Sequence, residues 1–206
     1  MRKTALLLLI LPLLFTACRS SKSIQNRFYV LEIPVSVHEK MPERLTPLAG
    51  SYFVKPVELS PAYASYQIAL REESHSIRYF SFNEWAERPS NALTAMVNSF
   101  FNTNQVFEET LTGRQTEQAD HIMQTRIHRM EADHQGSDFE ARLVVEFSLT
   151  DARTGEILHH HRADRSSPLP QRNLNLFAAA ISELFAEELA SFALQMLQVR
   201  TDGMRN

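Results

Sequence analysis

The sequence predicts an α/β fold of the α+β kind, in which a mixed, mostly antiparallel sheet carries two main amphipathic helices. Two segments, residues 91–101 and 173–198, repeat their apolar residues at helical spacing. Several other segments alternate apolar and polar residues, as half-buried strands do. A turn-forming sequence over residues 151–155 separates two of these segments, so we expect a long hairpin there.

The expected strands are rich in aromatic and β-branched residues and are bounded by proline or by polar turn residues. Pro34, Pro42 and Pro47 follow the first candidate, so residues 34–47 are expected to form a loop. The candidates cover residues 27–33, 51–59, 66–71, 76–80, 121–128, 139–149 and 157–163, with a short apolar piece at residues 106–107.

Each of the two expected helices has one apolar face, which must be buried against another part of the fold. Ser90 is the expected N-cap of the first helix, with Pro89 just ahead of it. The second helix is the longer one, and we expect its apolar stripe to cover the sheet. That stripe consists of Leu174, Phe177, Ile181, Leu184, Phe185, Leu189, Phe192 and Met196.

The N-terminus has the layout of an export signal, with Arg2 and Lys3 followed by an apolar run from Ala5 to Leu14. A run of about ten residues spans only about 15 Å as a helix, against the roughly 30 Å hydrocarbon core of a bilayer, so we expect it to be removed. Residues 14–18, Leu-Phe-Thr-Ala-Cys, resemble the lipobox of bacterial lipoproteins. Cys18, the only cysteine, is therefore the expected lipid acceptor. The alternative is an ordinary signal peptide that happens to contain a cysteine.

These features divide the chain into a cleaved signal peptide at residues 1–17, a lipidated and flexible tether at 18–26, a single domain at 27–200 and a tail at 201–206. Loss of two basic residues with the signal peptide lowers the formal net charge from −3 to −5. The remaining Lys and Arg residues are interspersed with acids instead of clustered, which argues against a nucleic-acid partner.

Several motifs of the chain resemble one known family. The aromatic segment at residues 27–31 is similar to the family's first strand, and residues 54–63 are similar to its second strand and Pro-x-Tyr turn. The most specific stretch is residues 77–89, which resembles the family's strand-to-helix junction centred on Trp-Ala. The pattern continues at residues 119–121, Ala-Asp-His, and at the turn over residues 151–155. The family is that of the auxiliary lipoproteins of ABC-type transport systems, which are associated with MCE (mammalian cell entry) lipid-transport proteins.

The resemblance implies a non-catalytic subunit of an MCE/ABC-type transporter that moves lipids or other hydrophobic compounds across the periplasm of a diderm bacterium. Its implied partners are an MCE-domain protein and ABC transporter subunits, with the membrane reached through the lipid anchor; a homo-oligomer is left open. No cofactor is implied. Residue 19 is Arg instead of the Asp that resembles an inner-membrane retention signal, so we expect the periplasmic face of the outer membrane.

The sequence lacks the common catalytic motifs. Its five glycines form no Gly-x-x-x-x-Gly-Lys-Ser/Thr phosphate loop, and neither a nucleophile elbow nor a His-Glu-x-x-His pair occurs, so we expect no enzyme. His159, His160 and His161 are a suggestive cluster, because alternation puts the first and third on one face of a strand. The hairpin predicts apolar partners, Phe147 opposite His159 and Val145 opposite His161. We therefore expect no metal site, and favour strand-end histidines or a pH-sensitive surface.

Phe80, Phe82 and Trp85 lie at the strand-to-helix junction, where they could form a partner or lipid contact. The alternative, which we favour, is that they fill the core beneath the helix. Two other functions stay open. One is a structural or regulatory outer-membrane lipoprotein, such as an envelope scaffold or a cell-wall synthase activator. The other is an enzyme with an unrecognised site around the histidines.

Overall fold

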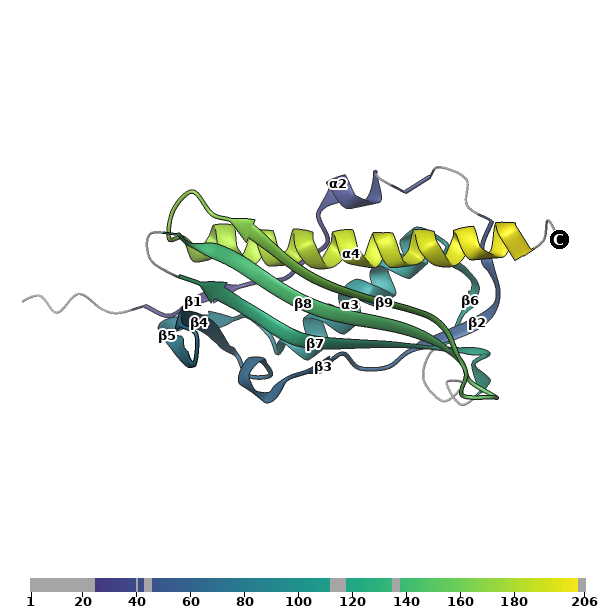
Figure 1. The fold of residues 1–206 in the computed structure, drawn as a ribbon, viewed down its shortest axis with the longest axis horizontal. Coiled ribbons are helices and arrows are strands. Elements are labelled where there is room, and N and C mark those ends of the chain that lie inside the picture. The colour runs from purple at the N-terminus through teal and green to yellow at the C-terminus, as the bar shows by residue number, and fades with distance from the viewer. Residues whose placement is uncertain (1–24, 40, 43–45, 112–117, 135–137, 204–206) are drawn as a thin grey trace, which may run out of the picture.

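The computed structural model describes residues 25–39, 41–42, 46–111, 118–134 and 138–203 (Figure 1). The predicted signal peptide and the tether up to residue 24, Cys18 included, lie outside the described residues. Within the described ranges, no helix is both long enough and apolar enough to cross a membrane. The strands are β1 (Arg27–Tyr29), β2 (Leu48–Val54), β3 (Glu58–Leu59), β4 (Gln67–Glu73), β5 (Ser76–Trp85), β6 (Phe107–Thr110), β7 (His121–Asp133), β8 (Glu140–Asp151) and β9 (Ile157–Pro168), and the helices are α2 (Val35–His38), α3 (Pro89–Thr103) and α4 (Leu174–Gly203).

The long strand β7 organises the sheet. One of its edges pairs antiparallel with β8 along its whole length, and β8 pairs antiparallel with β9. Its other edge takes three short parallel strands in turn, β2 at its start, β3 in its middle and β4 at its end. β5 pairs antiparallel with β4, while β1 and β6 add parallel strands beside β5 and β2. The longest ladders are therefore antiparallel and the parallel ladders are short, which confirms the predicted mixed, mostly antiparallel sheet.

Helices α3 and α4 cover the same face of the sheet. The ring of Phe147 in β8 lies 5.5 Å from that of Phe192 in α4, and the ring of Tyr52 in β2 lies 5.5 Å from that of Phe101 in α3. Pairing through β7 places Tyr52 and Phe147 on one face. All residues of the predicted α4 stripe are buried except Leu174, which is partly buried. The prediction that this helix packs on the sheet is confirmed.

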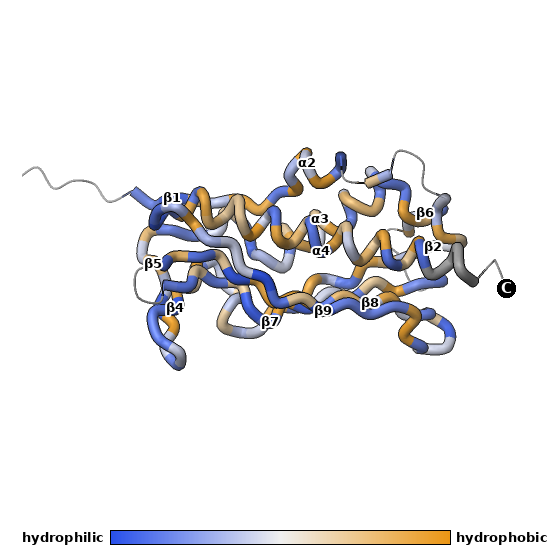
Figure 2. Tube along the Cα trace, turned by 45° about the horizontal axis from the view of Figure 1, so that its top comes forward, coloured by the Kyte–Doolittle hydropathy of each residue, from blue (hydrophilic) through white to orange (hydrophobic). Residues whose placement is uncertain are grey.

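Residues 30–38, called the strap below, cross the helices on the side away from the sheet, as the position of α2 shows in Figures 1 and 2. Val37 is fully buried, and the ring of His38 stacks on Phe100 of α3 at 5.8 Å. The strap thus holds the beginning of the domain against the helices. It also means that the loop predicted over residues 34–47 begins with a short helix, α2.

Several predicted strand boundaries differ from the structure. β7 and β9 continue to Asp133 and Pro168, past the predicted ends at residues 128 and 163. The strand expected over residues 51–59 is split into β2 and β3, because Pro56 has no N–H and cannot continue the ladder with β7. β1 ends at Tyr29, where the chain leaves the sheet edge to form the strap. β5 continues as far as Trp85, because β1 pairs with its last three residues.

Ser90 is not the N-cap of α3. Arg88 occupies that position, and Pro89, whose fixed φ suits the first helical residue, begins the helix. The Ser90 hydroxyl instead donates to the carbonyl oxygen of Val57 at 2.6 Å. This bond ties the start of α3 to the connection between β2 and β3.

The face of the sheet opposite the helices is polar and carries paired charges. Arg126 of β7 lies 3.0 Å from the carboxylate of Glu58 in β3. Arg142 of β8 lies 3.2 Å from the carboxylate of Asp164 in β9. Exposed pairs of this kind add little to stability, but they give this face a mixed charge of both signs.

Candidate functional site

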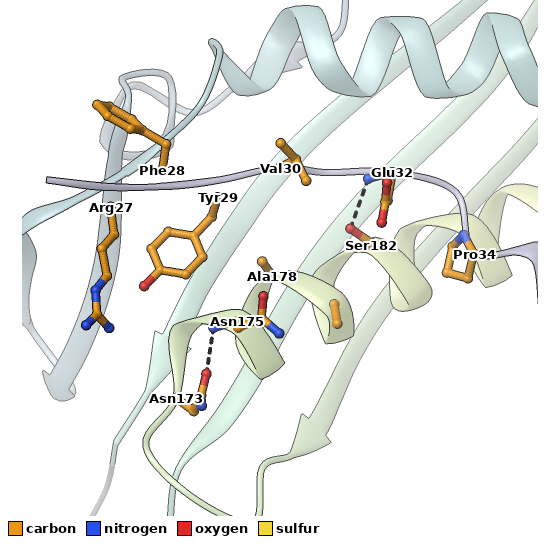
Figure 3. Close-up of a pocket in the computed structure, with 11 residues that line it drawn as sticks. Arg27, Phe28, Tyr29, Val30, Glu32, Pro34, Asn173, Asn175, Ala178 and Ser182 are labelled. Atoms are coloured by element: carbon orange, nitrogen blue, oxygen red, sulfur yellow. Dashed lines mark hydrogen bonds between the residues drawn. The ribbon is translucent and has the colours of Figure 1, made fainter.

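The described domain enters the sheet at an edge, nine residues after Cys18. Residues 27–29 pair in parallel with residues 83–85 of β5. Alternation along β1 turns Tyr29 toward α4, and its hydroxyl donates to Asn83 Oδ1 at 3.1 Å. Phe28 points the other way, as Figure 3 shows. The edge nearest the tether therefore presents an aromatic side chain to solvent.

A groove of about 710 Å³ lies between this entry segment and the first turns of α4 (Figure 3). Glu32 of the strap donates its backbone N–H to Ser182 Oγ at 3.2 Å. Asn173 Oδ1 accepts the N–H groups of Asn175 at 2.8 Å and Leu176 at 3.3 Å, so it caps the start of α4. These hydrogen bonds fix the strap and the start of the helix. The polar groups that make them have a structural role, and they do not form a set of reactive side chains. The lining of the groove is Arg27, Phe28, Tyr29, Val30, Glu32, Pro34, Asn173, Asn175, Ala178, Ala179 and Ser182.

The three aromatic residues predicted at the strand-to-helix junction lie in different environments. Trp85 is 3% exposed, and its ring lies 5.9 Å from that of Phe177 in α4. Phe80 is partly buried, and the guanidinium carbon of Arg172 lies 6.0 Å from its ring centre. Phe82 is 51% exposed. The three rings therefore do not form one surface, and Phe82 is the one among them that is mostly open to solvent.

Phe82 is exposed where β5 bulges away from β4. In β4 one residue separates Gln67 from Ala69, whereas in β5 four residues separate their partners Glu84 and Tyr79. Phe82 has a φ of +61°, in the left-handed region that bulky residues rarely adopt. An extra stretch of this kind bends the strand and redirects a side chain. Here the ring is directed away from the core.

Sequence reasoning missed two further exposed apolar residues at this edge, Phe28 at 60% and Val30 at 59%. The segment over residues 27–33 has the composition of a half-buried strand, and nothing in it indicates an edge position. The sequence did contain one indication that an aromatic residue of this segment is exposed. Because side chains alternate in a strand, only one of the neighbours Phe28 and Tyr29 can face the core.

The histidines of β9 alternate between the two faces of the sheet, but their predicted partners were wrong. His159 lies opposite Leu149 and His161 opposite Phe147, two residues away from the predicted register. At the turn Thr150 already pairs with Ile157 instead of the predicted Glu156, which shifts the pairing by one residue. The ladder is irregular between Leu149 and Thr150, and this adds the second residue of the shift. In the parts of the chain that the structure describes, no group of three or more His, Cys, Asp or Glu side chains could hold a metal ion.

His161 contacts an acidic residue that sequence reasoning did not find. Its Nε2 lies 2.8 Å from Oε2 of Glu188, which is buried on α4 and also pairs with Arg165. His160, on the outer face, lies 3.4 Å from a carboxylate oxygen of Glu146 in β8. These contacts tie β9 to the helix and to β8.

His159 lines an apolar cavity of about 350 Å³, to which β2 and β6 also contribute. These two strands lie at the end of the molecule opposite β1 (Figure 1). The ring of His159 lies 5.2 Å from that of Phe192, and burial lowers its pKa. Its Nε2 has no hydrogen-bond partner within the described residues. The site therefore favours the neutral imidazole. The other lining residues are Leu48, Ala49, Phe107, His121, Leu149, Leu158 and Met196.

Comparisons with known proteins give one family and a set of similar folds. A family model described as "ABC-type transport auxiliary lipoprotein component" matches residues 29–193. No curated protein matches the chain. The crystal structure of protein XCC0632 from Xanthomonas campestris is similar with a TM-score of 0.73 and 13% identity, over 87% of this chain and 99% of that one. A crystal structure of an uncharacterized protein is similar with a TM-score of 0.63 and 10% identity, over 84% of this chain and 99% of that one. At these identities the likeness shows a shared fold.

Proposed function

The chain belongs to the family of ABC-type transport auxiliary lipoprotein components, and from this membership we propose that it is the non-catalytic subunit of an MCE/ABC-type transporter for lipids or other hydrophobic compounds. The observation that carries the proposal is the family match, which runs from β1 into α4. The residues quoted for the resemblance, from the aromatic first strand to the hairpin turn, fall within this match or at its edge.

We infer that Cys18 carries the lipid. It is the only cysteine of a chain that belongs to a lipoprotein family, and it lies nine residues before β1. At about 0.8 kcal/mol per buried CH₂, two or three long acyl chains hold a protein on a membrane almost permanently. A sulfur bound in a thioether can neither attack a substrate nor form a disulfide. In this proposal Cys18 anchors the domain, and the domain acts by binding other subunits.

The proposed location is the periplasmic face of the outer membrane, because residue 19 is Arg and not Asp. The proposed direct partner is an MCE-domain protein that reaches the anchored domain across the periplasm. ABC transporter subunits then belong to the same assembly through that protein.

Crosslinking in intact cell envelopes, with the full lipidated chain as bait, tests the partner. We expect capture of an MCE-domain protein and, with it, of ABC transporter subunits. Capture of cell-wall synthases or other scaffold proteins in their absence would instead support a structural or regulatory lipoprotein. The Cys18→Ser chain is the matched control, because it keeps the whole domain and lacks the lipid acceptor.

Gene deletions test the same proposal without a binding assay. Deletion of the gene for this chain and deletion of the gene for the MCE protein should give the same envelope-permeability defect. The double deletion should add nothing, because both products serve one pathway. Additive defects would contradict the proposal.

A further inference from the structure

Exposed aromatic side chains gather at the sheet edge that receives the tether. Phe28 is 60% exposed, Phe82 is 51% exposed and Tyr66 is 43% exposed. They come from three separate segments that the pairing brings together. Phe28 lies opposite Glu84 in β5, and Glu84 is two residues after Phe82. The carbonyl oxygen of Tyr66 accepts the N–H of Trp85, the next residue of β5, at 2.8 Å.

The length of the chain between Cys18 and this edge limits how far the edge can lie from a membrane. Phe28 is the tenth residue after Cys18. Even fully extended, this stretch spans at most about 36 Å. The acylated sulfur therefore cannot lie farther than that from the Phe28 backbone, whatever path the chain takes.

The opposite end of the molecule lies far from β1, where the tether enters the domain. Helix α4 has 30 residues and runs along the long axis of the molecule, away from β1 (Figure 1). At 1.5 Å per residue it is about 45 Å long. The end of the domain that carries β1 is therefore the end that the anchor keeps near the bilayer.

The chemistry of this edge suits the boundary between lipid headgroups and acyl chains. Tryptophan and tyrosine are enriched at that depth in membrane proteins, and phenylalanine is common on the membrane-facing side of segments that lie in this region. The tether adds Arg19 and Lys22, and β1 begins with Arg27, which are attractive to anionic headgroups. The bulge at Phe82 holds a ring outward in a backbone conformation that is unfavourable for phenylalanine, and strain of this kind is concentrated at functional sites.

We propose that Phe28 and Phe82 insert into the interfacial region of the bilayer that holds the lipid of Cys18. The β1 edge then lies against the membrane and the far end of α4 points away from it. Lipid and rings together set the orientation in which the domain meets its partner. The inference rests on the lipid attachment proposed above.

Tryptophan scanning with the full lipidated chain tests this orientation. The protein is placed in vesicles of phosphatidylethanolamine and phosphatidylglycerol that contain brominated phosphatidylcholine, which quenches tryptophan at short range. Phe28→Trp and Phe82→Trp should each be quenched. Leu158→Trp is the matched control, because Leu158 is 44% exposed and lies at the start of β9, which is at the end of the molecule opposite β1 (Figure 1), so it should not be quenched. The native Trp85 is buried and supplies the same background in every variant.

Equal quenching at all three positions, or no quenching at Phe28 and Phe82, would overturn the proposal. If the same two positions instead crosslink to another protein in intact envelopes, the edge is a protein-docking surface and the proposal is also wrong. The mass of the purified protein shows separately whether Cys18 carries lipid. Failure of the anchor and failure of the membrane contact are therefore distinguishable.

A second measurement uses the unlipidated chain, residues 19–206, and flotation with the same vesicles without bromine. The double variant Phe28→Thr/Phe82→Asn should bind the vesicles at least about tenfold more weakly than the unchanged sequence, because it lacks the two rings that are partly buried in the bilayer in this proposal. Asparagine tolerates the positive φ at position 82 and threonine suits a strand, so the melting temperature should change little. Equal binding of the two forms would contradict membrane insertion of these rings.

Discussion

Arg71 of β4 and Glu131 of β7 form a buried ion pair, with Arg71 Nε donating to Glu131 Oε1 at 2.6 Å. The Glu131 side chain is fully buried, and that of Arg71 is 12% exposed. Tyr63 donates its hydroxyl to the second carboxylate oxygen at 2.7 Å, and burial with this contact raises the pKa of Tyr63 to about 12. The pair thus fastens β4 and the Pro-x-Tyr turn to β7, where the backbone ladder between β4 and β7 is only two residue pairs long.

Replacement of Arg71 should strongly destabilise the domain. Arg71→Met leaves the Glu131 carboxylate buried, with Arg129 at 3.4 Å as a weaker partner, so we expect a loss of about 3 kcal/mol in the free energy of unfolding. Tyr63→Phe removes one hydrogen bond and should cost about half as much. The double variant Arg71→Met/Glu131→Met should recover part of the loss, because no uncompensated charge is left. Urea unfolding measures all three, and a double variant no more stable than Arg71→Met would contradict this account.

A substitution at Gly50 should cost more than one at Gly155, although both glycines have a positive φ, +89° and +75°. A Cβ at Gly50 would lie 2.9 Å from Oδ2 of Asp120, which accepts both the N–H and the hydroxyl of Ser51 at 2.8 Å. A Cβ at Gly155 would meet nothing within 4 Å. Gly155→Ala should therefore lose only the backbone term, about 1–2 kcal/mol, and Gly50→Ala clearly more. Equal shifts of the urea midpoint would show that Asp120 can move aside at no cost.

Local pattern was sufficient to predict the long elements. Alternation of apolar residues located β7 and β8, and helical spacing located α3 and α4, because in each of these elements one face is largely buried. β9 has no fully buried residue and was located as the return strand after the turn at residues 151–155. Seven of the eight residues of the predicted α4 stripe are buried, so the stripe itself marked the core.

The arrangement around β1 could not be predicted in the same way, because it depends on contacts far apart in sequence. Whether Phe82 faces the core is decided by the bulge between β4 and β5, and Trp85 is buried by α4. The histidine register depended on the position of the hairpin turn and on one irregularity at Leu149, which local spacing does not reveal. The partner of His161, Glu188, lies 27 residues away on a helix, so no strand pattern could reveal it.

The domain should lose stability at mildly acidic pH in part through His159. Burial lowers the pKa of His159 below its ordinary value of 6.5, so the folded protein binds this proton less readily than the unfolded chain does. The contribution of neutral His159 is therefore complete above about pH 6.5 and is lost as the pH falls below it. His159→Phe keeps a ring against Phe192 and removes the titration, so its free energy of unfolding should fall less than that of the wild type between about pH 7.5 and about pH 5.5. An unchanged dependence in His159→Phe would exclude this role.

Sorting between the two membranes should depend on residue 19. The wild-type chain, with Arg19, should sediment with outer-membrane density on a sucrose gradient. Arg19→Asp introduces the residue that resembles an inner-membrane retention signal, and should move most of the protein to inner-membrane density. Arg19→Ser is the control, since it removes the positive charge without adding a carboxylate. Wild-type protein at inner-membrane density would contradict the proposed location.

Lipid attachment should be lost completely in Cys18→Ser, because the acyl acceptor is the sulfur and the chain has no second cysteine. Metabolic labelling with a fatty acid should mark the wild-type protein and leave the variant unlabelled. The described domain begins at residue 25, so the melting temperature of the variant should match that of the unlipidated wild-type domain.

The same variant should also show the permeability defect of the gene deletion, even when it is expressed at the wild-type level. Two or three long acyl chains contribute far more to membrane binding than two aromatic rings, so the domain without lipid is no longer held beside its partner. A labelled Cys18→Ser protein would show that lipid is attached elsewhere. An unlabelled but fully functional one would show that contacts of the folded domain suffice to place it in the envelope.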